Sequence, residues 1–146
     1  MYKCKYFTTQ ELVSPEWYKA KGERAIEWIP QIILKALDDI RELVASPCII
    51  NSYSRGLKNC GLRHHLTSVG AKYSRHKQSF AFDLHFTKKD MHYVWNLLYS
   101  NAYRFGIGTM EKWQCTNIKK ESSSGWIHIE LGAILEHGEF PKLVGA

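Results

Sequence analysis

Two short segments with strand-like alternation carry ionisable residues on one side, and they constrain the fold more than any other feature. Trp126–Leu131 alternates Trp, His and Glu with Ile, Ile and Leu, and Phe80–Phe86 alternates in the same sense. Successive side chains of a strand point to opposite faces of its sheet. His128 and Glu130 therefore share one face of the last segment, and Asp83 lies on the face of the earlier segment that is opposite its large apolar residues.

Ionisable groups on an otherwise apolar strand carry a desolvation cost unless their side of the strand forms a cleft with a partner. A metal ion is such a partner. His76 stands too far before Asp83 to share a helical or strand face with it, and its position suits a loop ligand that folds back on a strand ligand. Two imidazoles and one carboxylate leave a fourth position on zinc for water, as in hydrolytic sites. The sequence predicts Zn²⁺ held by His76, Asp83 and His128.

The first third of the chain predicts helices. Thr8 and Glu11 have the spacing of a capping box, which predicts a short helix at this point. After Pro30, the segment Gln31–Ala45 places its apolar residues on one stripe, while Asp38 and the other charged residues fall elsewhere. This pattern is typical of an amphipathic helix with one buried face.

The remainder alternates expected strands with one more helix. Cys48–Ser52 is short and apolar and predicts a strand, followed by a loop rich in Gly, Asn, Ser and His. Thr87 with Asp90 predicts a helix cap, and Gly106–Gly108 predicts another strand. The buried face of that helix is expected to consist of Met91, Val94, Trp95 and Leu98. The fold class is α+β, with helices packed on a mainly antiparallel sheet.

Length and composition restrict the class of protein further. The 146 residues fit one domain, residues 1–146, and no apolar run reaches the roughly 20 residues of a membrane span. The start of the chain runs into polar residues at Thr8, so no signal peptide is predicted. The net charge of +6 suits a polyanion, but the basic residues are scattered and no nucleic-acid-binding motif accompanies them. No nucleic acid partner is expected.

Cysteines and the remaining histidines are interpreted as ordinary structural residues. The four cysteines lie far apart without a CxxC pair and are predicted to be reduced thiols; they are Cys4, Cys48, Cys60 and Cys115. A histidine near aromatic residues is usually structural, and this interpretation applies to His64, His65, His92 and His137.

Several motifs resemble those of a known family. Ser74–Asp83 resembles the SxHxxGxAxD signature of the M15 zinc peptidases, although Ser79 stands where the family has Gly. Trp126–His128 is similar to the family's strand that bears the last zinc histidine, and Ile50–Arg55 is similar to its strand ending in S-x-x-R. With Phe7–Leu12 at the start, the resemblance spans nearly the whole chain. It is closest to the small phage and prophage branch.

The resemblance implies a hedgehog/DD-peptidase-like fold and a zinc-dependent peptidase of bacterial cell-wall peptide. Arg55 would bind substrate and polarise the scissile carbonyl. Relatives often place an acid three residues before the last histidine, but Gly125 occupies that position here. Glu130 is the preferred general base because it shares a strand face with His128, and Glu121 is the reserve.

Substrate and location follow from the same resemblance. The expected partner is a peptidoglycan peptide, and both endopeptidase and carboxypeptidase activity stay open. The protein is expected to be a monomer that stays in the host cytoplasm until it is released to the cell envelope. An inactive zinc-containing cell-wall-binding module is the alternative function, and a nucleic-acid-binding protein is a weaker one. Residues expected to contact substrate are Ser52, Ser74, His85 and Trp126. For Trp113, both a place in the cleft and aromatic core packing stay open.

Overall fold

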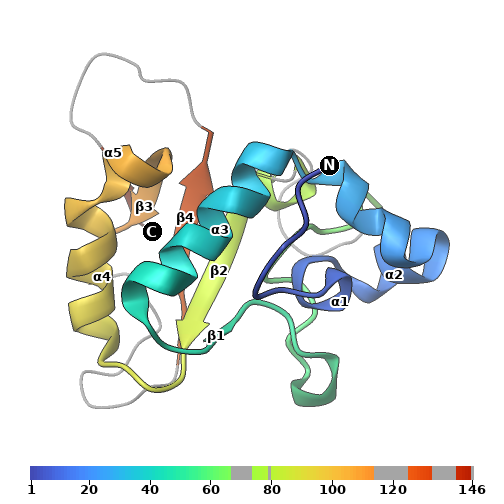
Figure 1. The fold of residues 1–146 in the computed structure, drawn as a ribbon, viewed down its shortest axis with the longest axis horizontal. Helices are drawn as coiled ribbons and strands as arrows, with labels where there is room; N and C mark the ends of the chain where they lie inside the picture. Colours follow the sequence, from blue (N-terminus) through green and yellow to red (C-terminus); the bar gives the residue numbers. More distant parts are fainter. Residues whose placement is uncertain (67–73, 79, 114–124, 133–140, 146) are drawn as a thin grey trace.

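A five-stranded sheet carries the fold in the computed structural model, which describes residues 1–66, 74–78, 80–113, 125–132 and 141–145 (Figure 1). Its strands follow the order β1-β2-β4-β3-β5, with antiparallel pairing except between β3 and β5, which are parallel. The described residues thus form a single α+β domain with a mainly antiparallel sheet, as the sequence predicts. The strands are β1 (Cys48–Ile49), β2 (Ala81–Phe86), β3 (Ile107–Glu111), β4 (Ile127–Leu131) and β5 (Lys142–Val144).

Helices gather at both ends of the sheet and across one face. Figure 1 shows α3 (Gln31–Val44) lying over β2 and β4, with α1 and α2 at one end of the molecule and α4 and α5 at the other. The other helices are α1 (Thr9–Leu12), α2 (Pro15–Lys21), α4 (Met91–Ser100) and α5 (Ala102–Phe105), and the 3₁₀ helices are η1 (Gly22–Trp28), η2 (Tyr53–Arg55) and η3 (Arg75–Gln78).

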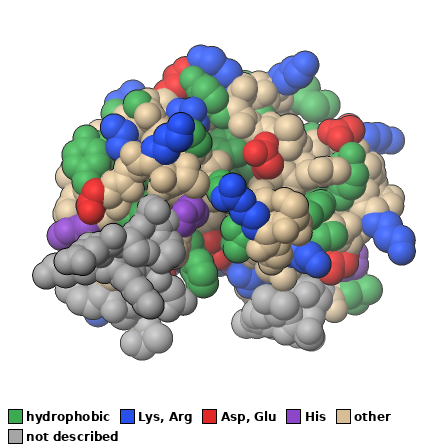
Figure 2. Space-filling view, turned by 90° about the horizontal axis from the view of Figure 1, so that it is seen from below, with side chains coloured by type: hydrophobic (Ala, Val, Ile, Leu, Met, Phe, Trp, Pro, Cys, Tyr) green, Lys and Arg blue, Asp and Glu red, His purple; other side chains and the backbone are tan. Residues whose placement is uncertain are grey.

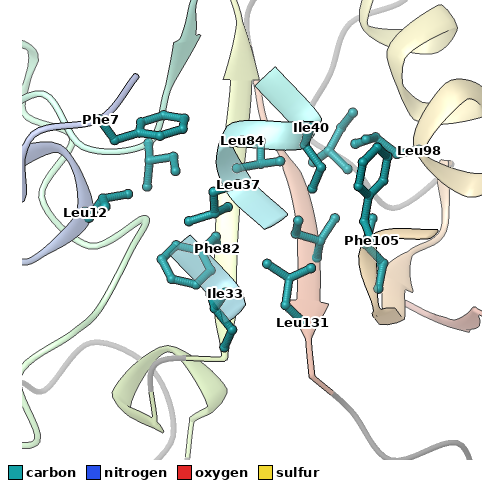
Figure 3. Packing of buried hydrophobic residues seen from close by; sticks show 14 of the residues in the cluster. Phe7, Leu12, Ile33, Leu37, Ile40, Phe82, Leu84, Leu98, Phe105 and Leu131 are labelled. Carbon is teal, nitrogen blue, oxygen red and sulfur yellow. The ribbon is translucent and has the colours of Figure 1, made fainter. Parts of the chain in front are cut away.

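Helix α3 contributes Ile33, Leu34, Leu37, Ile40 and Val44 to the hydrophobic core. Its buried stripe faces β2 and β4, and Figure 3 shows Ile33 and Leu37 directed at Phe82 of β2. The predicted helix is confirmed to within one residue, because it ends at Val44 with Ala45 as its C-cap. Burial of such side chains supplies about 25 cal/mol per Å² of apolar surface.

Asp38, which the sequence places off the apolar stripe of this helix, is nevertheless buried. Asp38 is 2% exposed. Its carboxylate accepts hydrogen bonds from the Tyr2 hydroxyl (2.6 Å) and from the backbone N–H groups of Lys5 (2.7 Å) and Tyr6 (3.1 Å). The N-terminal segment covers α3 at this point, and a buried carboxylate is tolerated because three donors satisfy it. Helical periodicity alone does not reveal this contact.

Local signals account for several element boundaries. The Glu11 carboxylate accepts from the Thr8 N–H at 2.7 Å, which confirms the predicted capping box. At α4 the cap is Asp90 alone, whose carboxylate accepts from the Tyr93 N–H at 2.8 Å; the inclusion of Thr87 was wrong. The predicted buried face of α4 is confirmed.

The strands predicted at Cys48–Ser52 and Gly106–Gly108 differ in length from the strands of the structure. The first pairs only over Cys48–Ile49, shorter than predicted. The other begins at Ile107 and continues past Gly108 to Glu111. Its extension matters because it brings an acid to the site described below.

Three further features of the described residues bear on the sequence predictions: the helix lengths, the surface charge and the cysteines. Within the described ranges, no helix is both long and apolar enough to cross a bilayer. On the face seen in Figure 2, lysine and arginine are dispersed and acidic side chains lie among them. Cys4, Cys48 and Cys60 are free thiols, as predicted, and Cys115 lies outside the described residues.

Candidate metal centre

The register of two neighbouring strands brings an acid and a histidine together. Asp83 of β2 lies directly opposite His128 of β4 in the antiparallel ladder. Directly opposed residues have Cβ atoms about 5 Å apart, close enough for their side chains to meet. His128 Nδ1 lies 2.8 Å from Asp83 Oδ1. The alternation predicted for β4 is confirmed, since Ile127, Ile129 and Leu131 are buried on its other face.

A 3₁₀ helix supplies the third group. His76 lies in η3, is 4% exposed, and places Nε2 3.5 Å from Asp83 Oδ1. Its Nδ1 lies 3.1 Å from the Gly61 carbonyl oxygen. Because a carbonyl oxygen only accepts, Nδ1 carries a proton, and Nε2 is the ring nitrogen that faces Asp83. A carbonyl that fixes the tautomer of an imidazole in this way is typical of a metal-ligating histidine.

These three residues can hold one metal ion. Their candidate ligand atoms all lie within 4.8 Å of one another. Two atoms bound about 2.1 Å from the same ion at the tetrahedral angle are roughly 3.4 Å apart, so only small side-chain movements separate the observed positions from a closed site. The donor chemistry fits as well, since the set contains two imidazoles and one carboxylate.

Without a metal, the same groups form an ion pair. Burial alone would raise the pKa of Asp83, but hydrogen bonds with His128 and His76 outweigh it and lower that pKa to about 2. Burial alone would lower the pKa of His128, but hydrogen bonds with Asp83 and Glu130 outweigh it and raise that pKa to about 9. A protonated His128 donates from both ring nitrogens, which matches its two carboxylate neighbours. A divalent cation would replace the proton on Nδ1.

Backbone groups from a neighbouring loop hold this arrangement. The Asp83 N–H donates to the Cys60 carbonyl at 2.8 Å, and the next carbonyl, that of Gly61, contacts His76. A Cβ on Gly61 would lie 2.2 Å from the Leu12 carbonyl oxygen, so only glycine fits there. The buried Asn51 side chain accepts from the Cys60 N–H at 2.9 Å. The loop is therefore clamped between α1 and the metal-binding groups.

A cavity of about 540 Å³ opens beside the three residues. Of the residues expected to contact substrate, Ser74 and Trp126 line it, and Trp126 is 37% exposed. Ser52 and Arg55 do not; they line a different cavity of about 520 Å³ beside η2. His85 Nδ1 instead contacts the Gly125 carbonyl, ahead of β4. The complete lining of the first cavity is Arg63, Ser74, His76, Asp83, Glu111, Trp126, His128, Val144 and Gly145.

The predicted base Glu130 contacts His128 but does not line the cavity. Its Oε1 lies 3.5 Å from His128 Nε2, and its Oε2 lies 3.6 Å from Arg75 Nε. The hydrogen bond with His128 lowers the pKa of Glu130, and the Arg75 charge adds to that effect. This carboxylate is therefore placed to orient the histidine.

Sequence reasoning missed two ionisable residues of the cavity, Arg63 and Glu111. The β3–β4 ladder pairs Met110 with Ile129, and one further step places Glu111 beside His128. Burial raises the pKa of Glu111. Extending the predicted strand beyond Gly108 would have placed this acid on a strand. Arg63 lies in a loop without periodicity, where no local signal marks it.

The remaining histidines have aromatic neighbours, in keeping with a structural role. His64 and His65 stack at 4.4 Å between ring centroids, with Trp17 5.1 Å from His64. His92 stacks on Trp113 at 4.5 Å. Trp113 is absent from the cavity lining and packs against the hydrophobic core, which is the second of its two expected roles. Ser79, Cys115, Glu121 and His137 lie outside the described residues.

The chain matches no family model, no curated protein and no solved structure. The resemblance to the M15 peptidases therefore rests on the motifs in the sequence alone. What the structure adds is the convergence of His76, Asp83 and His128 at the wall of a cavity.

Proposed function

We propose that the protein is a zinc-dependent peptidase that hydrolyses peptide bonds of bacterial peptidoglycan. The observation that supports this most strongly is the convergence of two imidazoles and one carboxylate beside a cavity of about 540 Å³. This donor set is typical of catalytic zinc sites, which use three protein ligands and leave a position open. The order of the motifs along the chain supports the M15 assignment and its hedgehog/DD-peptidase fold.

Zinc bound in such a site supplies a water molecule whose pKa is lowered to about 7, together with a positive charge that polarises a carbonyl. The protein must supply a general base that takes a proton from the nucleophile and passes it to the leaving amine. Glu130 and Glu111 are the candidates among the described residues. Glu111 is favoured by its place in the cavity wall and by its raised pKa, whereas Glu130 is engaged by His128 and Arg75.

The two acids are separated by matched substitutions. Glu111→Gln is expected to lower kcat at least a hundredfold with unchanged zinc content, because general acid–base catalysis contributes about 10²–10⁴-fold. Glu130→Gln is expected to weaken zinc binding about 10–100-fold, as loss of the group that orients a metal-bound histidine does. Zinc titration and amine release from peptidoglycan measure both effects. The reverse pattern would make Glu130 the base.

Activity itself is tested with purified peptidoglycan. The protein should release free amines from it, a chelator should abolish the release, and added Zn²⁺ should restore it. His128→Ala should be inactive, while His92→Ala, which removes a histidine outside the cavity, should retain activity. Amine release that survives chelation would reject the mechanism.

Gly125 favours the alternative function, a module that holds zinc and binds cell-wall peptide without turnover, because relatives often carry an acid there. Such a module would bind zinc and sediment with peptidoglycan but would release no amines. The carboxylate of Glu111 in the cavity favours the enzyme.

A further inference from the structure

Arg63 is held in place by contacts on several sides. Its Nε donates to the Asn59 carbonyl oxygen at 2.6 Å, and its backbone N–H donates to the His76 carbonyl at 3.1 Å. Its own carbonyl accepts from the Trp17 indole N–H at 3.2 Å. The guanidinium is therefore oriented before any ligand arrives, so little side-chain entropy is lost when it binds one.

The terminal nitrogens of this guanidinium make no hydrogen bond within the described part of the chain. Nη2 lies 3.8 Å from Asp83 Oδ2, which is an ion pair but too long for a hydrogen bond. The side chain is only 13% exposed and lines the cavity. Burial lowers the pKa of Arg63, yet a guanidinium stays charged at neutral pH. A largely buried guanidinium whose terminal N–H groups have no hydrogen-bond partner among the described residues can form strong, charge-assisted hydrogen bonds with an anion.

We propose that Arg63 binds a free carboxylate of the substrate, so that the site selects peptides with a carboxylate close to the bond that is cut. This inference rests on the proposed function. Asp83 is a candidate metal ligand, and it also forms an ion pair with Arg63. A carboxylate bound by Arg63 would therefore lie close to the metal and to the bond that is cut. The separation along the substrate is within about two residues, of roughly 3.5 Å each. A planar guanidinium pairs with a carboxylate through two parallel hydrogen bonds, which a neutral amide cannot match.

Two sources carry this chemistry: the C-terminus of a peptide and an acidic residue within it. Arg63 would favour a peptide with either carboxylate over an uncharged peptide. The distance between Arg63 and the candidate metal ligands is compatible with both kinds of carboxylate. The second cation near the candidate ligands, Arg75, already pairs with Glu130 at 3.6 Å and is absent from the cavity lining. Among the described residues that line the cavity, Arg63 is the only arginine or lysine.

Binding of uncleavable ligands tests the inference separately from turnover. The probes are three N-acetylated tripeptide analogues with ketomethylene bonds. One ends in D-Ala with a free carboxylate, one in D-Ala amide, and one in D-Glu amide, so that the last carries only a side-chain carboxylate. Titration calorimetry with zinc-loaded protein measures their dissociation constants for wild type, Arg63→Gln, Arg63→Lys and the exposed control Arg24→Gln.

The wild type should bind at least one carboxylate ligand about tenfold or more tightly than the neutral amide, and the tighter of the two identifies the source. Arg63→Gln should reduce this ratio to nearly one, Arg63→Lys should retain part of it, and Arg24→Gln should leave it unchanged. Equal binding of all three ligands by the wild type would overturn the inference, as would an equal loss for all ligands in Arg63→Gln. A protein that shows the Arg63-dependent preference but never releases amines would instead reject the peptidase.

Discussion

The cavity beside His76 and the cavity beside Arg55 are almost equal in volume, about 540 and 520 Å³, but their polar side chains are engaged differently. In the second cavity, Glu11 accepts from a backbone N–H at a helix cap, and Asn51 accepts from the Cys60 N–H and donates to the Val13 carbonyl. These side chains hold the backbone. In the first cavity, ionisable side chains face one another.

The difference shows which polar groups are available for chemistry. A side chain that satisfies buried backbone groups cannot leave them without a cost of about 1–3 kcal/mol. Asp83 and His128 instead share a proton between their side chains, and a metal ion can take the place of that proton. Substitutions beside the first cavity can therefore be compared with substitutions beside the second one or elsewhere in the molecule.

Removal of a metal ligand should have the largest effect. His128→Ala should lower zinc affinity more than a hundredfold, because loss of a group that merely orients a ligand already costs about 10–100-fold. Elemental analysis after dialysis should find stoichiometric zinc in the wild type and almost none in the variant. His92→Ala is the matched control, and equal zinc in both variants would exclude His128 as a ligand.

The second largest effect is expected from Gly61→Ala, which adds a methyl group to the loop that supports the metal-binding residues. Gly61→Ala places a Cβ 2.2 Å from the Leu12 carbonyl oxygen, so the loop that contacts Asp83 and His76 must shift. We expect a loss of about 3 kcal/mol in the free energy of unfolding and weaker zinc binding. Urea denaturation measures the first effect.

Gly56→Ala, beside the second cavity, is the control for this substitution. Nothing lies within 4 Å of its added Cβ, and only its φ of +75° opposes the change. It should cost about 1 kcal/mol and leave zinc binding intact. Equal effects of the two substitutions would show that the close approach at Gly61 is not important.

Zinc affinity should depend on pH through His128. Its pKa in the metal-free protein is raised from 6.5 to about 9 by Asp83 and Glu130, so zinc must displace one proton at pH 7. Apparent affinity should rise about tenfold per pH unit and level off near pH 9. The ion pair also stabilises the metal-free fold below pH 6.5, and this contribution should disappear as pH rises through 9. Competition with a chelator at pH 6–9 measures the affinity; a plateau already above pH 6.5 would contradict the ion pair.

The smallest effect is expected from substitution of Arg55, which the sequence motif places in the active site but which lies beside the other cavity in the structure. Arg55→Gln should change zinc affinity less than twofold, because Arg55 lines the other cavity. Isothermal titration with Zn²⁺ checks this. A large loss of affinity would mean that the η2 segment reaches the metal centre in solution.

Local sequence patterns correctly predicted helices and strands whose buried face follows from the spacing of their own apolar residues. The stripe of α3, the alternation of β4 and the cap at Thr8 all have confirmed counterparts. The grouping of His76 with Asp83 and His128 came from a spacing and a family motif, and the structure brings these three residues together.

What the sequence did not reveal depends on contacts between distant segments. Asp38 is buried because the N-terminal segment crosses α3, and the parallel pairing of β5 with β3 joins segments with no shared periodicity. Glu111 reaches the cavity through strand register, and Arg63 through the hydrogen bonds of a loop. Such positions follow from tertiary packing, which single-segment patterns do not contain.

The most direct test of the central claim is X-ray absorption spectroscopy of the zinc-loaded protein. We predict a four-coordinate ion with two imidazole nitrogens at about 2.0–2.1 Å and oxygen ligands at about 2.0–2.2 Å, one of them from Asp83. A sulfur shell at about 2.3 Å would place the ion on a cysteine, and a spectrum with no imidazole scattering would remove His76 and His128 from the site. Either result would contradict the metal centre described above.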